Sequence, residues 1–598
     1  MSTPNLPAVH PRPRRRDKIF MALGLNKKHD QQIPIEPFSS SVEEVWSTPL
    51  LLERIASFLP RAEVACNVRC VNPVTAVVLA FPILLSEPCP SDVFAAYWSV
   101  PDVTRSCTLS KRRHLLALVG ASGVVANFET ALKAAGTVPT GETMEAAASA
   151  GKLESCMWLH KRGCPWGKAL SMAASAGHLE LCEWLLGNGC TWTRDAVYAA
   201  ARGGHRVLME WLLQQRTTDH GSDVRMEELL AAAVEGFDLN TFKQLYRDLF
   251  NGDLLPQRQL QQQPRRLSPM QQDLLIAAAA GSPGTDWQAK VKWIEDQDCD
   301  NDLKPPQPAS KKPIVTRSLN AASRAAICQN AVARLRWLQE RGYPMEFERT
   351  NFQLAGRHGR ISLMRTILSG GQQGLFLRDA AEAAAEAGQL DFLIALKDMS
   401  PMDEGIVRAV ALQAARSAQH MVLKWAVEMG FAIGDDSEVF PAAAQSGSAE
   451  MMDWVWRRNM IYSSESMLNA VDGGCEEALD WMKEHNFLAG SSQDPSKLYF
   501  QAARNGDLKI LLWLRRQLPG PLPEGFVAQC ERAVCPRPAI EWLVDEAGCA
   551  VDWQVAGLST DWPGLLGWLN TNHRSLGSLS TTTGTSSTGS GREFQLPQ

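Results

Sequence analysis

The sequence predicts an all-α protein, a solenoid built from repeated helical hairpins. Two sequence motifs recur together at intervals of about 26 to 33 residues: a run of small residues that ends in Gly, and a Trp-Leu pair a few residues later. The clearest copy is AASAG at 173–177, followed by Trp184 and Leu185. Intervals of this length are typical of arrays in which each unit buries its apolar face against its neighbours. We therefore expect a binding surface and not an active site.

Within one unit, the small-residue run predicts a first helix and the Trp-Leu pair predicts a second. Ala196, Ala199 and Ala200 have the i, i+3, i+4 spacing of one helical face. The Gly that follows ends this helix, because glycine adopts a positive φ without strain. The periodic Trp is expected to pack in the core between repeats. The structural repeat positions predicted in this way are Gly151, Trp158, Gly177, Trp184, Gly204 and Trp211.

The Trp of each Trp-Leu pair serves as a marker for counting the units. It places about 14 units between residues 140 and 571. Two wide gaps between markers, near 251–272 and 297–316, are rich in Gln, Pro or Lys and predict loop insertions. The markers, with their replacements, are Trp158, Trp184, Trp211, Gln244, Trp293, Trp337, Ile367, Ala395, Trp425, Trp454, Trp481, Trp513, Trp542 and Trp568.

The sequence of the units resembles that of the ankyrin repeat. Residues 173–180 read AASAGHLE, and WLL at 184–186 and NG at 188–189 continue the pattern of that family. The family's Thr-Pro-Leu-His opening is absent, and the units are shorter than its usual length of ~33 residues. The array is therefore similar to a divergent, shortened type found in protists and algae. The resemblance implies a helical-hairpin solenoid with a protein partner bound on its concave surface.

Residues 43–80 break the period and resemble an F-box. IASFLP at 55–60 matches the core of that motif, and RCVN at 69–72 stands where the family has Arg-x-Val-Cys. The acid of the family's opening Leu-Pro-x-Glu is missing, and Thr75 replaces its Trp. The resemblance implies docking on the small adaptor of a cullin-type ubiquitin ligase through Leu51, Leu52, Ile55, Phe58, Leu59 and Pro60. The alternative is a capping hairpin whose apolar residues cover the first unit.

The remaining segments differ from the array in composition. Residues 1–40 predict a disordered basic tail, and 572–598, rich in Ser, Thr and Gly, predict a second tail that cannot bury a core. Residues 86–139 predict helices that form either a bridge or degenerate first repeats. No stretch approaches the ~18 consecutive apolar residues of a membrane span.

Charge and motif content argue against a nucleic-acid binder and against an enzyme. The 598 residues include 60 Lys+Arg and 65 Asp+Glu, a formal net charge of −5, whereas nucleic-acid binders have a strongly basic face. The 14 Cys mostly follow the repeat period and lack CxxC spacing, so we expect packing roles and no metal site. His178 and His205 recur with the repeat, and we expect them to bond to neighbouring turns. No catalytic residue and no cofactor are predicted.

These observations predict a protein–protein interaction protein. The leading hypothesis is a substrate-recognition subunit of a cullin-type ubiquitin ligase, in which the array binds the protein partner and residues 43–80 bind the adaptor. The alternative is an ankyrin-repeat scaffold or adaptor without a ligase link. No signal peptide is recognised, so reduced thiols in the cytoplasm are expected, with the nucleus as the alternative.

Overall fold

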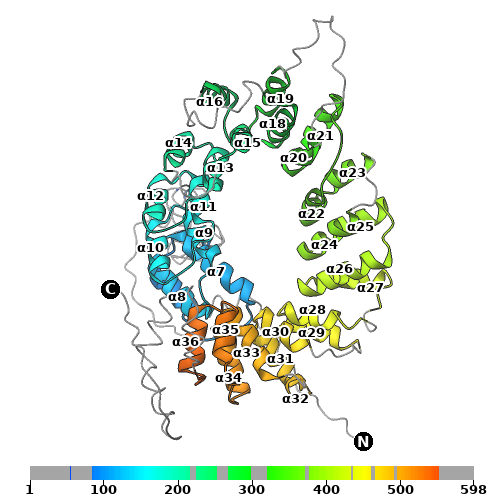
Figure 1. Cartoon of the computed structure of the whole chain (residues 1–598). Helices are drawn as coiled ribbons and strands as arrows, with labels where there is room; N and C mark the ends of the chain where they lie inside the picture. Colours follow the sequence, from blue (N-terminus) through cyan, green and yellow to red (C-terminus); the bar gives the residue numbers. More distant parts are fainter. Residues whose placement is uncertain are drawn as a thin grey trace, which may run out of the picture. The chain divides into compact units, whose positions relative to one another are not determined.

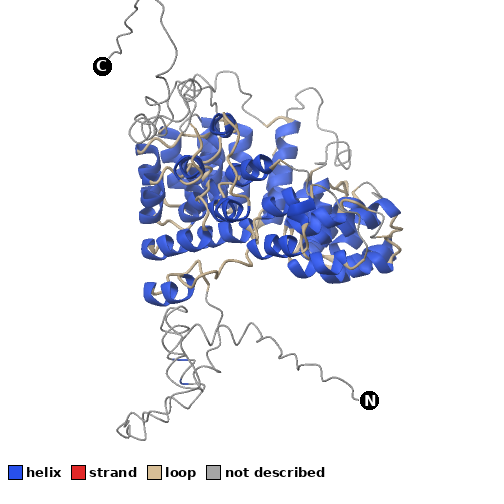
Figure 2. Ribbon diagram, turned by 90° about the horizontal axis from the view of Figure 1, so that it is seen from below, coloured by secondary structure: helices blue, strands red, loops and turns tan. Residues whose placement is uncertain are grey.

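The computed structural model describes residues 84–215, 224–251, 267–297, 320–370, 376–432, 436–458, 465–490 and 494–550, together with Leu51 and Arg54. In this part of the chain every regular element is a helix and there is no strand, as Figure 2 shows. The chain divides into two compact units, Met1–Ser492 and Gln493–Gln598, which are described separately. None of the described helices is long and apolar enough to span a lipid bilayer.

In the first unit, helices of two kinds alternate along the chain, and each first helix packs on the next first helix to form a row (Figure 1). The first helices are α7 (Leu109–Ser122), α9 (Gly141–Ser149), α11 (Ala169–Ala176), α13 (Arg194–Arg202), α15 (Met226–Gly236), α18 (Pro269–Gly281), α20 (Ala321–Ile327), α22 (Arg349–Arg357), α24 (Leu377–Ala387), α26 (Glu404–Arg416), α28 (Val439–Gln445) and α30 (Ser466–Gly473).

Each first helix is followed by a second helix that packs back against it. The second helices are α8 (Val125–Ala135), α10 (Leu153–Lys161), α12 (Leu179–Gly187), α14 (Arg206–Gln214), α16 (Leu239–Asn251), α19 (Trp287–Glu295), α21 (Ala331–Glu340), α23 (Ile361–Ser369), α25 (Leu390–Met399), α27 (His420–Glu428), α29 (Ala449–Trp456) and α31 (Glu476–Glu484). Helix α6 (Ser91–Trp98) precedes the row, and α32 (Phe487–Gly490) follows it. Helices α7 and α30, at the two ends of the row, are also in contact.

The row is held together by small residues that face both neighbours. In α24, Ala380, Ala381, Ala384 and Ala385 are all fully buried, two adjacent pairs one helical turn apart. Side chains of this size let the backbones of neighbouring first helices come close. The approach is closest where the residue is glycine: a Cβ on Gly356 would lie only 2.1 Å from the Ala380 carbonyl oxygen. The predicted small-residue helix is thus the element that stacks.

The second helices bury three positions with a fixed spacing. In α12 the buried residues are Leu181, Cys182 and Leu185, which lie three and two positions before the marker Trp184 and one position after it. The spacing places the three side chains on one face, as an amphipathic helix requires. The Leu of each Trp-Leu pair is therefore the core residue.

This spacing shows that Ile367 was assigned as a marker one position too late. Helix α23 buries Leu363, Met364 and Ile367, so Thr366 stands at the marker position and Ile367 is the equivalent of the core Leu. The four apolar residues of 363–368, Leu363, Met364, Ile367 and Leu368, admit two registers, and only the burial distinguishes them.

Helices α7 and α8 have the same pattern as the units that follow. Helix α8 buries Asn127, Phe128 and Ala131 with the spacing of the second helices, and α7 packs on α9 as a first helix does. Residues 109–135 therefore have the burial pattern of a repeat unit.

The second unit contains two further pairs, α33 (Pro495–Arg504) with α34 (Leu508–Gln517) and α35 (Phe526–Arg532) with α36 (Arg537–Asp545). Helix α34 buries the same three positions, Ile510, Leu511 and Leu514, and Trp513 is buried as well. The predicted tails, the marker Trp568, most of residues 43–80 and most of both insertions (252–266 and 298–316) lie outside the described residues. The predicted segment boundaries therefore stay predictions.

Candidate protein-binding face and the contacts that position it

At several junctions between neighbouring first helices, a polar side chain from the start of a second helix contacts the preceding first helix. His178 Nε2 lies 3.2 Å from the Ser149 carbonyl oxygen, at the end of the preceding first helix. The His178 ring also covers Gly151, whose φ is +67°, and a Cβ there would lie 2.6 Å from the ring. His205 covers Gly177 in the same way, with φ +82° and a separation of 2.5 Å. The prediction that these histidines bond to neighbouring turns is confirmed for His178, and the His205 ring lies over the equivalent turn.

Other units use different side chains for the same contact, which we call the clasp. Gln389 and Gln419 each donate an amide hydrogen over 3.4 Å to a carbonyl near the end of the preceding first helix, and Arg360 donates to the Cys328 carbonyl over 3.1 Å. Because the clasp satisfies carbonyls that a helix end leaves free, it belongs to the packing of the array. The recurring His is thus a structural residue.

The marker Trp side chains lie at the edge of the core and not inside it. Every marker Trp in the described part of the first unit, including Trp158, Trp184 and Trp211, is half-buried, whereas the Leu after each of these three is fully buried. The marker Trp therefore packs between repeats at the margin of the core, and the core itself is filled by the Leu that follows it. Trp158 packs edge-on against Phe128 of the preceding unit, with ring centroids 4.6 Å apart.

Several of these Trp rings are covered by a basic or polar residue four positions later. The guanidinium of Arg162 lies 3.9 Å from the centre of the Trp158 ring, and that of Arg458 lies 3.5 Å from the Trp454 ring. Residues four apart are neighbours on a helix surface, and a cation over an aromatic face is attracted by it. The spacing Trp-x-x-x-Arg was visible in the sequence and would have indicated a helix surface.

The polar side of the first helices has a series of arginines paired with carboxylates, here called the charge ladder. Arg349 pairs with Asp379 of the next first helix, and Arg357 pairs with Glu386 at 3.0 Å. The ladder consists of Arg202, Glu235, Arg324, Arg349, Arg357, Arg378, Asp379, Glu382, Glu386, Arg408 and Asp436. Asp436 precedes α28; all the others lie on first helices.

The arginines of the ladder are exposed to solvent, and each is paired with a carboxylate. The side chains of Arg349 and Arg378 are 64% and 65% exposed. Arg408 is bound by Asp436 at 2.6 Å and by Glu438 at 3.3 Å, and the hydrogen bond to Asp436 raises the pKa of its guanidinium. Many of these pairs join residues about one repeat apart. Such pairing is not visible in the sequence, because it appears only when the units are in register.

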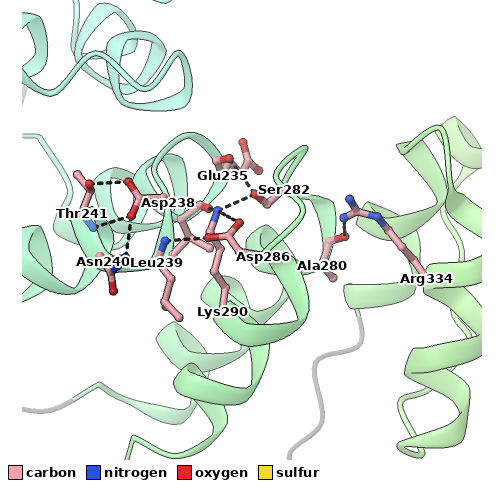
Figure 3. Close-up of polar contacts among 11 residues, drawn as sticks. Glu235, Asp238, Leu239, Asn240, Thr241, Ala280, Ser282, Asp286, Lys290 and Arg334 are labelled. Carbon is pink, nitrogen blue, oxygen red and sulfur yellow. Dashed lines mark hydrogen bonds and ion pairs between the residues drawn. The ribbon is translucent and has the colours of Figure 1, made fainter.

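Two buried bases tie together the units that follow the predicted insertions (Figure 3). Lys290, 1% exposed, donates to the Val234 carbonyl over 3.0 Å and to Ser282 Oγ over 2.9 Å, and its Nζ lies 3.3 Å from Asp286 Oδ1. Asp286 in turn accepts the backbone N–H of Leu239 over 2.8 Å. Burial lowers the pKa of Lys290 in spite of Asp286, because a charged amine loses its hydration there.

Arg334 repeats this arrangement one unit later. Its side chain is 3% exposed and donates to the Ala280 carbonyl over 2.7 Å, at the end of the first helix of the previous unit. Lys290 and Arg334 occupy the first of the three buried positions of their second helices, where α12 has Leu181. A base at an apolar position was the sequence signal for both residues.

The cysteines are buried at equivalent places in successive units. Burial raises the pKa of Cys156, Cys164 and Cys182 to about 12, so these thiols are weakly nucleophilic. Among the residues that the structure describes, no group of three or more His, Cys, Asp or Glu side chains is arranged to hold a metal ion.

The predicted adaptor-binding residues fall almost entirely outside the described residues. Leu51 is the exception: it is helical, and 45% of its surface is exposed. Leu52, Ile55, Phe58, Leu59 and Pro60 are not among the described residues. The structural repeat positions behave differently from one another, because Gly151, Gly177 and Gly204 all have positive φ whereas the three Trp lie at the edge of the core.

The alternation of stacked first helices and packed second helices defines a helical-repeat protein. No protein-family model matches the chain, and no curated protein matches it. Among solved structures it is similar to the pentatricopeptide repeat protein PPR10 in complex with an 18-nt psaJ RNA element, at 11% identity over 94% of this chain and 99% of that chain, with a TM-score of 0.21. PPR10 from maize is 14% identical over 94% and 98% of the two chains, also with a TM-score of 0.21. Scores this low carry no information on function.

Proposed function

We propose that the chain is a protein-binding scaffold whose partner binds the polar side of the first helices. The charge ladder supports this proposal. It offers exposed arginines together with the partly exposed carboxylates of Glu382 and Glu386, and a protein surface of mixed charge can exchange ion pairs with them. Long rows of stacked units provide such extended binding surfaces.

The same ladder is a poor match for a nucleic acid. A phosphate backbone is bound through an excess of Lys and Arg whose charges are not already neutralised. Here Arg202 and Arg324 share Glu235, and Arg378 is bound by Glu382 at 2.8 Å. Nucleic-acid binding is therefore the less favoured function, and the experiment that follows includes it as an outcome.

The test reverses the charge of Arg349, Arg357 and Arg378 together and measures protein partners by affinity purification with cross-linking from native cells. We expect the triple Glu variant to lose partners that the wild type retains. The matched control reverses three exposed bases on second helices, Arg365, Lys397 and Lys424, and should retain them. Equal recovery with both variants would contradict the proposal, as would RNA cross-linked by ultraviolet light to the ladder helices.

We further propose that the units are shortened ankyrin-type repeats. Their support is the positive-φ glycine after the first helix, the His that follows it, and the buried Leu at the end of the Trp-Leu pair. The described connectors contain no strand, so the proposal concerns the helical hairpin and its junctions. Grafting the residues 168–193 unit between two consensus ankyrin repeats tests it, since a matching unit should fold cooperatively with both neighbours.

For residues 43–80 we propose adaptor docking, which would make the chain a substrate-recognition subunit of a cullin-type ubiquitin ligase. This proposal is supported by the F-box-like sequences at 55–60 and 69–72. Replacing Ile55 and Leu59 by Lys should abolish co-purification of the adaptor, while partners of the charge ladder stay bound. Failure of the wild type to retain the adaptor would favour the scaffold without a ligase link. Either role is proposed for the cytoplasm, with the nucleus as the alternative.

A further inference from the structure

The two ends of the row in the first unit meet at a junction unlike the others. Arg112 of α7 is 1% exposed, and its guanidinium reaches both sides of this junction. One nitrogen donates to the Ala135 carbonyl and another donates to the Gly474 carbonyl, each over 2.7 Å. Gly474 ends α30, and it lies 362 positions from Arg112 in the sequence. A single buried side chain thus links the first repeat unit to the last.

A second set of contacts involves the segment just before α7. Arg105 forms an ion pair with Asp480 at 2.6 Å. Its carbonyl oxygen accepts the backbone N–H of Glu477 over 3.2 Å and lies 3.5 Å from the Cys475 thiol. Cys475 and Glu477 lie at the start of α31 or just before it, and Asp480 lies in the middle of that helix. The contacts named here, of Arg105, Arg112, Gly474, Cys475, Glu477 and Asp480, are called the latch.

The latch differs in chemistry from the junctions between successive units. At the junction of α22 with α24, fully buried Phe352 packs against Phe376 at the start of α24, with ring centroids 5.5 Å apart, so separating the helices would expose apolar surface to water. The contacts that define the latch are hydrogen bonds and an ion pair, whose groups water can satisfy after separation, and α7 packs on α30 less extensively than α22 packs on α24. Arg105 and Asp480 are already 50% and 26% exposed, so salt weakens their attraction.

We propose that the latch opens reversibly while the repeat units stay folded. Proteins open first where few apolar contacts and partly exposed polar contacts hold elements together. Opening separates α7 from α30 and frees both ends of the row. Each first helix then shifts slightly against the next to fit a partner, because the units of a quasi-linear array contact only their neighbours. The latch is therefore a conformational device that acts independently of which partner the row binds.

The Cys475 thiol reports the opening directly. It is fully buried, and its contact with the Arg105 carbonyl is part of the latch. Cys182 is equally buried but lies inside a repeat unit, so it serves as an internal control. The experiment measures alkylation of each thiol by iodoacetamide in the folded full-length chain, with peptide mass spectrometry, at low and at high salt.

We expect iodoacetamide to alkylate Cys475 faster than Cys182, and the difference to grow with salt. Arg105→Ala should accelerate Cys475 by up to about fivefold, the effect of a partly exposed ion pair. Arg112→Ala should accelerate it by about tenfold or more, because two hydrogen bonds from a charged donor are lost. In both variants the Cys182 rate should stay at the wild-type value.

Arg357→Ala is the matched control, because it removes a similarly exposed ion pair between two successive units. It should leave both alkylation rates unchanged. Arg105→Ala keeps the test decisive even if Arg112→Ala fails to fold. Equal rates for Cys475 and Cys182 in every variant and at every salt concentration would overturn the proposal, since the junction would then separate only when the repeats unfold.

Discussion

The regular junctions between units and the junctions after the predicted insertions are both joined by polar side chains, but these side chains differ in charge and in burial. At a regular junction, His178 or Gln389 reaches the preceding helix end from a half-buried position and carries no obligatory charge. After the insertions, Lys290 and Arg334 reach the equivalent carbonyls from positions that are 1% and 3% exposed. Polar contacts thus join both kinds of junction, and the burial of the polar side chain is what differs between them.

The difference follows from how the chain connects the units. A short connector holds neighbouring units close together, whereas a long insertion raises the entropic cost of bringing its two ends together. Within the described residues the buried bases are Arg112, Lys290 and Arg334, and each lies where the regular succession is interrupted. A hydrogen bond from a charged donor is stronger than a neutral one, which suits a junction that the chain itself holds less firmly.

The largest effect is expected from overfilling a regular junction. Gly356→Ala places a Cβ 2.1 Å from the Ala380 carbonyl oxygen, and backbone at this distance has no rotamer by which to move away. We expect a loss of about 3 kcal/mol in the free energy of unfolding, measured by urea denaturation. Gly187→Ala is the control, because a Cβ there meets nothing within 4 Å. A wild-type midpoint for Gly356→Ala would show that the first helices are not close-packed.

The next effect is expected at an interrupted junction. Lys290→Met keeps the length and the apolar stem of the side chain but leaves the Val234 carbonyl and Ser282 Oγ without the ammonium donor. We expect a loss of about 2 kcal/mol in unfolding free energy. A loss below that of a His178 variant would refute the contrast between buried and half-buried fastening.

The same residue gives a pH test with a defined sign. The folded-state pKa of Lys290 is lowered from its ordinary value of 10.5, so folding releases a proton between these two values. The stabilisation tied to this shift is complete above the unfolded-state pKa and is lost as the pH falls through the folded-state pKa. The stability difference between wild type and Lys290→Met should therefore widen as the pH rises toward 10.5. A difference that narrows would show that the ammonium is not desolvated.

A smaller loss is expected at a regular junction. His178→Ala removes the contact with the Ser149 carbonyl and uncovers Gly151, and water can reach the released carbonyl. The expected cost is about 1 kcal/mol. His178→Gln, which copies the residue found at Gln389, should restore most of it. If Gln restored nothing, the clasp would depend on the imidazole ring and not on the hydrogen bond.

The helical hairpins were predictable because their signals are local. Ala at one-turn spacing and a Gly with positive φ specify the first helix and its end. The single register error, at Ile367, arose where the run 363–368 offers two apolar frames. The half-buried place of the Trp was not predictable, since a period shows that a residue recurs but not which of two adjacent residues faces the core.

The polar contacts were harder to predict, because they depend on register between units. Lys290 stands at an apolar position of its helix, but only the structure shows that its ammonium reaches across a junction to the Val234 carbonyl. Arg408 and Asp436 pair across one repeat, and the carboxylate partner of an arginine can be chosen from sequence only when the units are aligned. The latch joins segments far apart in the sequence, which no local pattern predicts.

The smallest effect is expected on the charge ladder, and its small size is the informative result. Arg349→Ala removes an ion pair with Asp379 from a side chain that is 64% exposed, so the unfolding free energy should change by only about 0–1 kcal/mol. Partner binding should nevertheless weaken if this arginine contributes to the proposed interface. Lys290→Met should do the reverse, lowering stability while leaving binding at low temperature unchanged. The two variants thus separate an effect on stability from an effect on binding. If Arg349→Ala lowered stability and partner binding in parallel, the ladder would belong to the packing of the array and not to its recognition surface.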